Sequence, residues 1–96
     1  MKITIKLHET KPLRDVRSVL ILAAGKKGVS LSSILNAVFE DDDTASHGYN
    51  ISNFYKIDTL ENPGIRLLYT VVRVAQELDV EVWLSPTIGI SPIKLF

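Results

Sequence analysis

The stretch NPGIRLLYTVVRVAQELDVEVWLS, residues 62–85, places an amphipathic helix directly before a strand. Apolar residues recur at helical spacing over 65–78, and the charged side chains lie mostly away from that stripe. The stripe consists of Leu67, Leu68, Val71, Val72, Ala75 and Leu78. Residues 80–85 then alternate in polarity and are rich in side chains that favour strands. We therefore predict a helix over 65–78, an end at Asp79 and a strand over 80–85.

A second strand is predicted before this helix, over 49–57, because apolar and polar side chains alternate there. A strand, a helix and a strand in this order form a βαβ unit, so the two strands are expected to be parallel neighbours. Residues 29–40 fit two patterns, a helix capped by Ser30 or a strand. The polar residues 41–48 that follow favour the strand, since two alternating runs around such a loop are typical of a hairpin.

The amino-terminal part of the chain adds one strand and one ambiguous element. Lysine and threonine alternate with Ile3, Ile5 and Leu7, which predicts a strand with one buried face. Residues 16–24 fit a helix, although the β-branched residues among them leave a strand open, and residues 25–28 are predicted to turn. We therefore predict an α/β (α+β) fold, a single domain over 1–96 whose mixed sheet carries a strand–loop–helix–strand unit.

Composition and charge exclude several classes of protein. The 96 residues have equal numbers of acidic and basic side chains, so a broad nucleic-acid-binding face is not expected. There is no cysteine, which rules out disulfides and thiol catalysis. No apolar run approaches the roughly 20 residues that a membrane span needs, and the alternating first residues do not form a signal peptide. The sequence predicts a cytoplasmic protein without membrane contact.

The start of the 65–78 helix has two interpretations. Asn62 can cap the helix and Pro63 can occupy its first position, which is a complete structural explanation. Alternatively, the backbone amides of Gly64, Ile65 and Arg66 lie free at the positive end of the helix dipole, where an anion binds readily. Both interpretations stay open on the sequence.

The stretch YNISNFYKIDTLENPGIRLLYTVVRVAQELDVEVWLSPT, residues 49–87, resembles the GNAT superfamily of acyl-coenzyme A N-acyltransferases, especially small members encoded by bacteriophages. In that family a strand leads into an Arg/Gln-x-x-Gly-x-Gly/Ala loop whose amides bind the pyrophosphate of the cofactor. Gly64 matches this loop, whereas Arg66 stands where a small residue is expected and Pro63 removes an amide. The tail GISPIKLF, residues 89–96, is similar to the start of the family's next helix, so the partial likeness extends over 49–96.

The resemblance implies a small acetyl-CoA-dependent N-acetyltransferase-like protein, either active or inactive and shortened, with an amine as its substrate. The helix start would hold the pyrophosphate, and the strand end would pair with the pantetheine arm. The cofactor-binding residues would then be Tyr55, Ile57, Asn62, Gly64, Ile65 and Arg66. Asp58 and Glu61 would be the catalytic bases. Each carboxylate also has a structural explanation, as a turn residue and as a first-turn acid.

Two non-enzymatic hypotheses compete with this one. The first is a binding or inhibitor protein of the kind that phages and plasmids encode, which docks on a host protein through an exposed strand edge or the acidic run 41–43. That run is predicted to be a solvated turn and not a metal site, because adjacent carboxylates point in different directions. The second is a homodimer that completes its sheet, since Ile90, Ile93, Leu95 and Phe96 have no evident means of burial.

Overall fold

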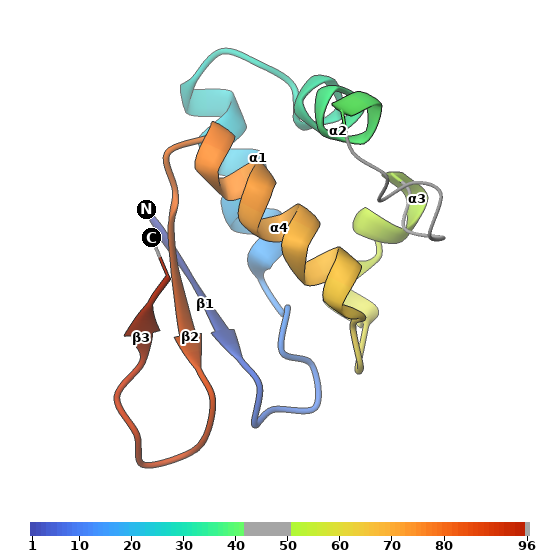
Figure 1. The fold of residues 1–96 in the computed structure, drawn as a ribbon. Coiled ribbons are helices and arrows are strands. Elements are labelled where there is room, and N and C mark those ends of the chain that lie inside the picture. The colour runs from blue at the N-terminus through green and yellow to red at the C-terminus, as the bar shows by residue number, and fades with distance from the viewer. Residues whose placement is uncertain (42–50, 96) are drawn as a thin grey trace.

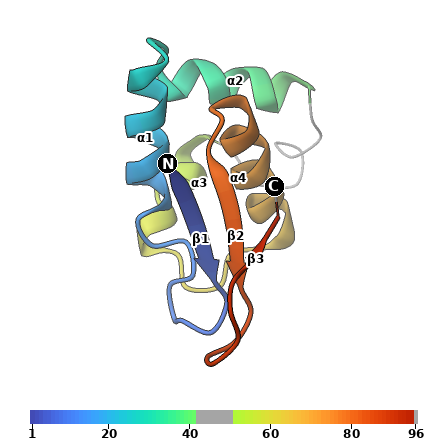
Figure 2. The ribbon, with the colours of Figure 1, turned by 90° about the vertical axis from the view of Figure 1, so that its left-hand side faces the viewer.

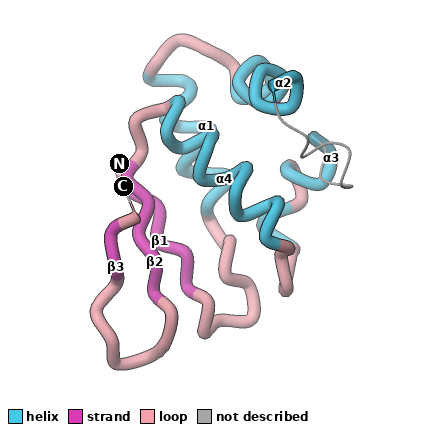
Figure 3. The backbone as a smooth tube through the Cα atoms, viewed as in Figure 1, coloured by secondary structure: helices cyan, strands magenta, loops and turns pink. Residues whose placement is uncertain are grey.

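The protein combines one small sheet with a layer of helices. The structure, a computed structural model, describes residues 1–41 and 51–95. Figure 1 shows the order of the elements along the chain, and Figure 3 separates helices from strands. Within the described residues the order is β1 (Lys2–Lys6), α1 (Val16–Lys26), α2 (Leu31–Asp41), α3 (Ile51–Phe54), η2 (Ile57–Thr59), α4 (Ile65–Glu77), β2 (Glu81–Ser85) and β3 (Ile93–Lys94). The fold is therefore mixed α+β.

The sheet has the strand order β1-β2-β3, with β2 in the centre. Strands β1 and β2 are parallel, with Ile3 opposite Val82, and β2 and β3 are antiparallel, with Trp83 opposite Lys94. The strands predicted at the amino terminus and after the long helix are thus confirmed. The predicted parallel neighbour of β2 is wrong, because the chain brings β1 to that position and not residues 49–57.

Helices α1 and α4 cover one face of the sheet, and α2 packs across both of them (Figure 2). Alternation along the strands sends Ile3, Ile5 and Val82 toward the helices, where all three are buried. The stripe of α4 meets them with Leu67, Val71 and other residues in one continuous apolar cluster. The other face of the sheet is covered by no element that the structure describes.

Residues 16–24 are helical, which decides between the two alternatives that the sequence leaves open. Helix α1 continues through Gly25 and Lys26, so the predicted turn is shorter than expected and begins at Lys27. Gly28 has φ +72°, and the Val29 amide reaches back to the Ala24 carbonyl at 3.1 Å. This is the left-handed helix end for which glycine is preferred, because it has no Cβ to clash.

The strand predicted over 29–40 is wrong, since these residues form α2. Ser30 caps the helix, with its Oγ accepting the Ser33 amide at 3.2 Å. Leu31, Leu35 and Val38 are buried at helical spacing against the other helices. Burial on a helical face thus overrides the hairpin pattern that favoured the strand.

The strand predicted over 49–57 is also wrong within the residues that the structure describes. Residues 51–54 form α3 and residues 57–59 form the short 3₁₀-helix η2, while 42–50, which hold most of the predicted hairpin loop, lie outside the described residues. Phe54 and Ile57, three positions apart, are both fully buried. That spacing belongs to helical turns, so burial follows a helical period here and not the alternation seen in the sequence.

The carboxyl-terminal tail forms a hairpin with β2 and not the start of a helix as expected. Leu95 donates its amide to the Val82 carbonyl at 2.8 Å, just beyond the two residues of β3. No single helix among the described residues is long and apolar enough to cross a bilayer. Helices α1 and α2 pass that test of length and composition only as a pair, and they are bent by 102°.

Candidate functional site

The residues predicted to bind acetyl-CoA lie in the segment from α3 to the first turn of α4. Tyr55 is half-buried, with its hydroxyl hydrogen-bonded to Ser32 and the Arg17 guanidinium 5.2 Å from its ring centre. Ile57 is a core residue with no exposed surface. Because neither residue belongs to a strand, their backbones offer no extended edge for a pantetheine arm. The predicted strand end is therefore wrong for both positions.

The helix cap differs from the sequence interpretation as well. Gly64 is the N-cap of α4, with φ −73° and ψ 162°, and its carbonyl accepts the amides of Leu67 and Leu68 at 3.1 and 3.2 Å. Asn62 and Pro63 therefore precede the helix and do not cap it or begin it. Glycine is an accepted N-cap residue, so its presence has a structural explanation. Ile65 and Arg66 are exposed in the first turn.

The two carboxylates predicted to be catalytic lie in different surroundings. Asp58 is in η2, and its Oδ1 is buried without a hydrogen-bond partner in the described residues. Glu61 is exposed in the loop before α4. The catalytic role of both carboxylates stays a prediction.

A different region has the geometry of a binding site, namely the free edge of β1. The Glu81 amide donates to the Met1 carbonyl at 3.2 Å, and the Leu7 amide donates to the Ser85 carbonyl at 3.0 Å. The backbone groups of odd-numbered residues in β1 therefore face β2. Because successive residues of a strand point their N–H and C=O groups to opposite sides, Lys2, Thr4 and Lys6 face outward.

Only part of this outer edge is satisfied internally. The Lys6 amide bonds to the Pro12 carbonyl at 3.4 Å, and the Lys6 carbonyl accepts the Glu9 amide at 3.1 Å. Within residues 1–41 and 51–95, the backbone groups of Lys2 and Thr4 have no partner. Lys2 and Thr4 thus present two N–H donors and two C=O acceptors on the outer edge of β1. At Lys6, the loop that follows β1 occupies the edge.

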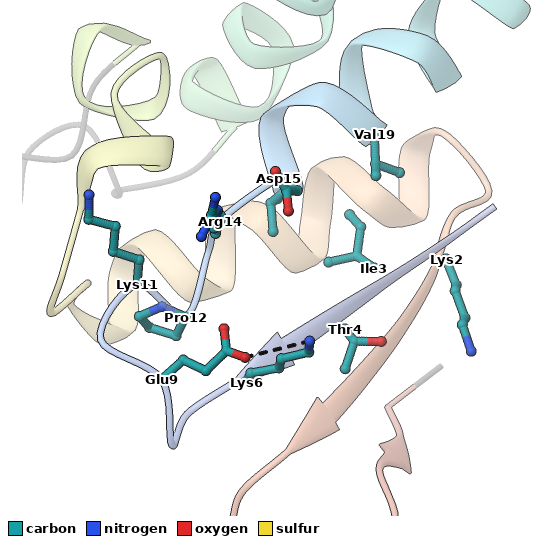
Figure 4. Close-up of a pocket in the computed structure, with 11 residues that line it drawn as sticks. Lys2, Ile3, Thr4, Lys6, Glu9, Lys11, Pro12, Arg14, Asp15 and Val19 are labelled. Atoms are coloured by element: carbon teal, nitrogen blue, oxygen red, sulfur yellow. Dashed lines mark ion pairs between the residues drawn. The ribbon is translucent and has the colours of Figure 1, made fainter.

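A groove of about 430 Å³ runs along this edge (Figure 4). Strand β1 forms one side, and the loop over 9–15 and the first turn of α1 form the other. Val19, which is half-buried, gives the helix side an apolar surface, and Asp15 stands at the helix start with φ +68°. We call this groove, together with the outward backbone of Lys2 and Thr4, the β1-edge groove.

The β1-edge groove is cationic although the whole chain has a formal net charge of zero. Its lining contains four basic side chains and two acidic ones: Lys2, Lys6, Lys11, Arg14, Glu9 and Asp15. Glu9 pairs with Lys6, with Oε1 and Nζ 3.6 Å apart. Lys11 and Arg14 form no ion pair with any described residue. The uncompensated charge in the groove is therefore positive.

The uncovered face of the sheet adjoins this groove. Lys2 places its ammonium 5.5 Å from the centre of the Trp83 ring, and Trp83 Nε1 donates to Glu81 Oε2 at 3.2 Å. Lys94 reaches Glu81 Oε1 at 3.4 Å. The hydrogen bond from Trp83, together with that from Lys94 and its charge, holds the pKa of Glu81 below its ordinary value of 4.5. Lys2 therefore contacts an aromatic ring and forms no ion pair with any described residue.

A serine–histidine contact lies at the carboxyl ends of β1 and β2. His8 Nε2 and Ser85 Oγ are 3.2 Å apart, and Ser85 is almost fully buried. A nucleophilic pair also needs a group that orients the imidazole, and His8 has no such partner among the described residues. The contact therefore fastens the loop after β1 to the end of β2.

Sequence reasoning did not identify the residues of the β1-edge groove. The alternation of residues 2–7 predicts the strand, but a strand becomes an edge only through the order of the sheet. The one sequence signal that was available is the group of three basic residues within 11–17, namely Lys11, Arg14 and Arg17, with Asp15 among them.

Comparison of this chain with protein-family models, with curated proteins and with solved structures gives no match. The resemblance to GNAT acyltransferases is therefore not confirmed, and a functional conclusion has to come from the geometry of the chain itself.

Proposed function

We propose that this protein is a non-enzymatic binding module that adds a strand of a partner protein to the free edge of β1. The observation that carries the proposal is the pair of outward-facing residues, Lys2 and Thr4, whose backbone groups are unsatisfied by any described residue and lie beside a groove. Strand addition is a general mode of peptide recognition, in which backbone hydrogen bonds supply affinity and side-chain pockets supply specificity.

The β1 edge is rigid enough for this role. Ile3 and Ile5 anchor the strand in the core from its inner face, and its other edge pairs with β2 along all five residues. A fixed backbone loses little conformational freedom when a partner binds, so more of the interaction energy appears as affinity.

The proposal is tested by selecting binders from a library of random linear peptides with the full chain as the target. We expect the selected peptides to shift and protect the amides of Lys2 and Thr4 in NMR titrations. Thr4→Pro removes an outward amide from an edge strand, where proline is tolerated, and should weaken binding at least about tenfold.

Lys94→Pro is the matched control for this experiment. Lys94 lies in β3 with its backbone facing away from β2, since the neighbouring Leu95 amide faces Val82. This variant should bind the selected peptides as the wild-type protein does. Peptides that bind Thr4→Pro and the wild type equally, or a selection that yields no binder, would overturn the proposal.

Acetyl-CoA-dependent N-acetyl transfer remains the alternative to be tested. Its one remaining structural support is the exposed first turn of α4, whose amides at Ile65 and Arg66 have no hydrogen-bond partner in the described residues. A thermal-shift titration with millimolar acetyl-CoA separates the two functions, because binding to the native state must raise Tm. A rise that Gly64→Asp and Arg66→Glu abolish would favour the enzyme.

A further inference from the structure

We infer that the strand received by the β1-edge groove is an acidic segment of a partner protein, with carboxylates alternating with apolar side chains. This inference depends on the proposed strand addition and specifies the chemistry of the partner. Three properties of the groove lead to it: the direction of its backbone groups, the sign of its charge and the character of its two walls.

The backbone geometry identifies the partner as an extended polypeptide. The outward N–H and C=O groups of Lys2 and Thr4 repeat at the spacing of a strand, and only another extended backbone offers donors and acceptors that match both kinds of group. The Lys6 amide is already bound to Pro12, so the added strand is short and ends beside the 9–14 loop.

The charge of the groove favours carboxylates at the side-chain positions on the uncovered face. Lys2 and Lys6 stand on that face at the two ends of β1. Lys11 and Arg14 line the other side of the groove without an ion-pair partner among the described residues. Opposite charges at cross-strand positions stabilise a sheet, and like charges there destabilise it. Acidic residues opposite the ends of β1 meet this requirement.

The alternate positions of the added strand face the helix layer. Side chains there lie on the same side as Ile3 and Ile5 and next to Val16 and Val19, which line the groove. A polar side chain at such a position would lose hydration without gaining a partner. Apolar residues are therefore expected between the acidic ones.

A second copy of this chain is a poor occupant of the same groove. Two β1 strands pairing in antiparallel fashion around Thr4 would place Lys2 of each copy opposite Lys6 of the other. Charged edge strands of this kind prevent edge-to-edge association in natural sheets. The charge pattern thus favours a partner of different sequence.

The test uses three capped peptides whose sequences read the same in both directions, so that the result is independent of strand orientation. They are Glu-Val-Thr-Val-Glu, its uncharged analogue Gln-Val-Thr-Val-Gln and the basic analogue Lys-Val-Thr-Val-Lys. Titrations of the full chain are followed by NMR at the Lys2 and Thr4 amides, at low and at high salt.

The acidic peptide should bind about tenfold or more tightly than the uncharged one, and this preference should shrink as salt increases. The double variant Lys2→Glu with Lys6→Glu should lose the preference and bind the basic peptide better than the wild type does. Both residues are exposed, so far-UV circular dichroism should be unchanged and will confirm that the variant folds.

The possible failures are distinguishable. If the uncharged peptide binds as well as the acidic one and Thr4→Pro weakens both, strand addition stands and the acidic preference is overturned. If library-selected peptides protect the β1 edge but lack carboxylates, the outcome is the same. If no peptide perturbs the Lys2 and Thr4 amides, or sedimentation shows a dimer that Thr4→Pro dissociates, the inference about an acidic partner is overturned.

Discussion

The two edges of the sheet differ in nearly every property that matters for binding. Strand β1 is five residues long, and its side chains Ile3 and Ile5 are buried in the core. Its outer edge is bordered by a groove with several basic side chains. The β3 edge is two residues long, and its neighbours Ile88, Ile90 and Leu95 are exposed apolar residues. If the proposed strand addition holds, the difference shows that openness alone does not make a strand edge a recognition site. Rigidity and charge distinguish an edge that can select a partner.

The largest effect should be the difference in stability between two variants in which one isoleucine is replaced by alanine, one in β1 and one in β3. Ile5 is 2% exposed and Ile93 is 53% exposed. Ile5→Ala should lower the free energy of unfolding by about 2–5 kcal/mol, because it removes buried methyl groups and leaves a cavity. Ile93→Ala should change it by less than about 0.5 kcal/mol, as exposed substitutions do. Urea denaturation of the two variants provides the measurement.

Equal destabilisation by the two isoleucine variants would contradict the comparison. It would mean that β3 is as firmly held as β1, and that rigidity does not distinguish the edges.

Hydrogen exchange should reveal the next largest difference, between neighbouring amides of β1 itself. The Ile5 amide faces β2 and exchanges only when the strand separates, whereas the Thr4 amide faces the groove. We expect the Ile5 amide to exchange roughly a hundredfold or more slowly than the Thr4 amide. Similar protection of both amides in the free protein would show that the β1 edge is already covered.

A smaller effect is expected from the apolar residues next to β3. The homodimer suggested by the sequence stays a prediction, and Ile88 and Ile90, which are 79% and 56% exposed, are the residues available to such a contact. Replacing both by serine should weaken any self-association about tenfold or more, since each loses roughly 1–2 kcal/mol of apolar burial. Sedimentation at several concentrations measures this, and peptide binding at the β1 edge should not change.

The smallest effect should come from the acid titration of Glu81. Its pKa is lowered in the folded state, so its contribution to stability is present above about pH 4.5 and is lost as pH falls through the lower folded value. NMR titration of the Glu81 carboxyl group should give a midpoint below 4.5, and Lys94→Met should raise that midpoint. An unchanged midpoint in the variant would show that Lys94 does not hold the carboxylate.

The sequence predicts some elements of this fold well and others badly, for a physical reason. The helix over 65–78 and the strands at the amino terminus and over 80–85 are confirmed because each has a single strong period. In residues 29–40 the same apolar side chains fit both the helical period and the strand period, and the packing of α2 on α4 decides in favour of the helix. Phe54 and Ile57 are similar, since a four-residue helix is too short to show a period of its own.

The candidate site was harder to predict than the fold. The residues predicted around Gly64 are neighbours in sequence, and their proposed role required a strand that the chain does not form there. The β1-edge groove joins Lys2 and Thr4 to Lys11 and Arg14 through the sheet order, which depends on pairing between distant segments. No local pattern contains that information.

The parallel pairing of β1 with β2 also bears on how the chain folds. Lys2 pairs with Glu81, so the contact closes a loop of 79 positions, from residue 2 to residue 81. Such long-range pairing forms slowly compared with the local contacts inside α1, α2 and α4. During synthesis on the ribosome, β1 emerges before β2 and has to wait for the residues between them, with both of its edges unpaired. We therefore expect the lysines of β1 to act as charges that keep a nascent strand from aggregating until β2 arrives.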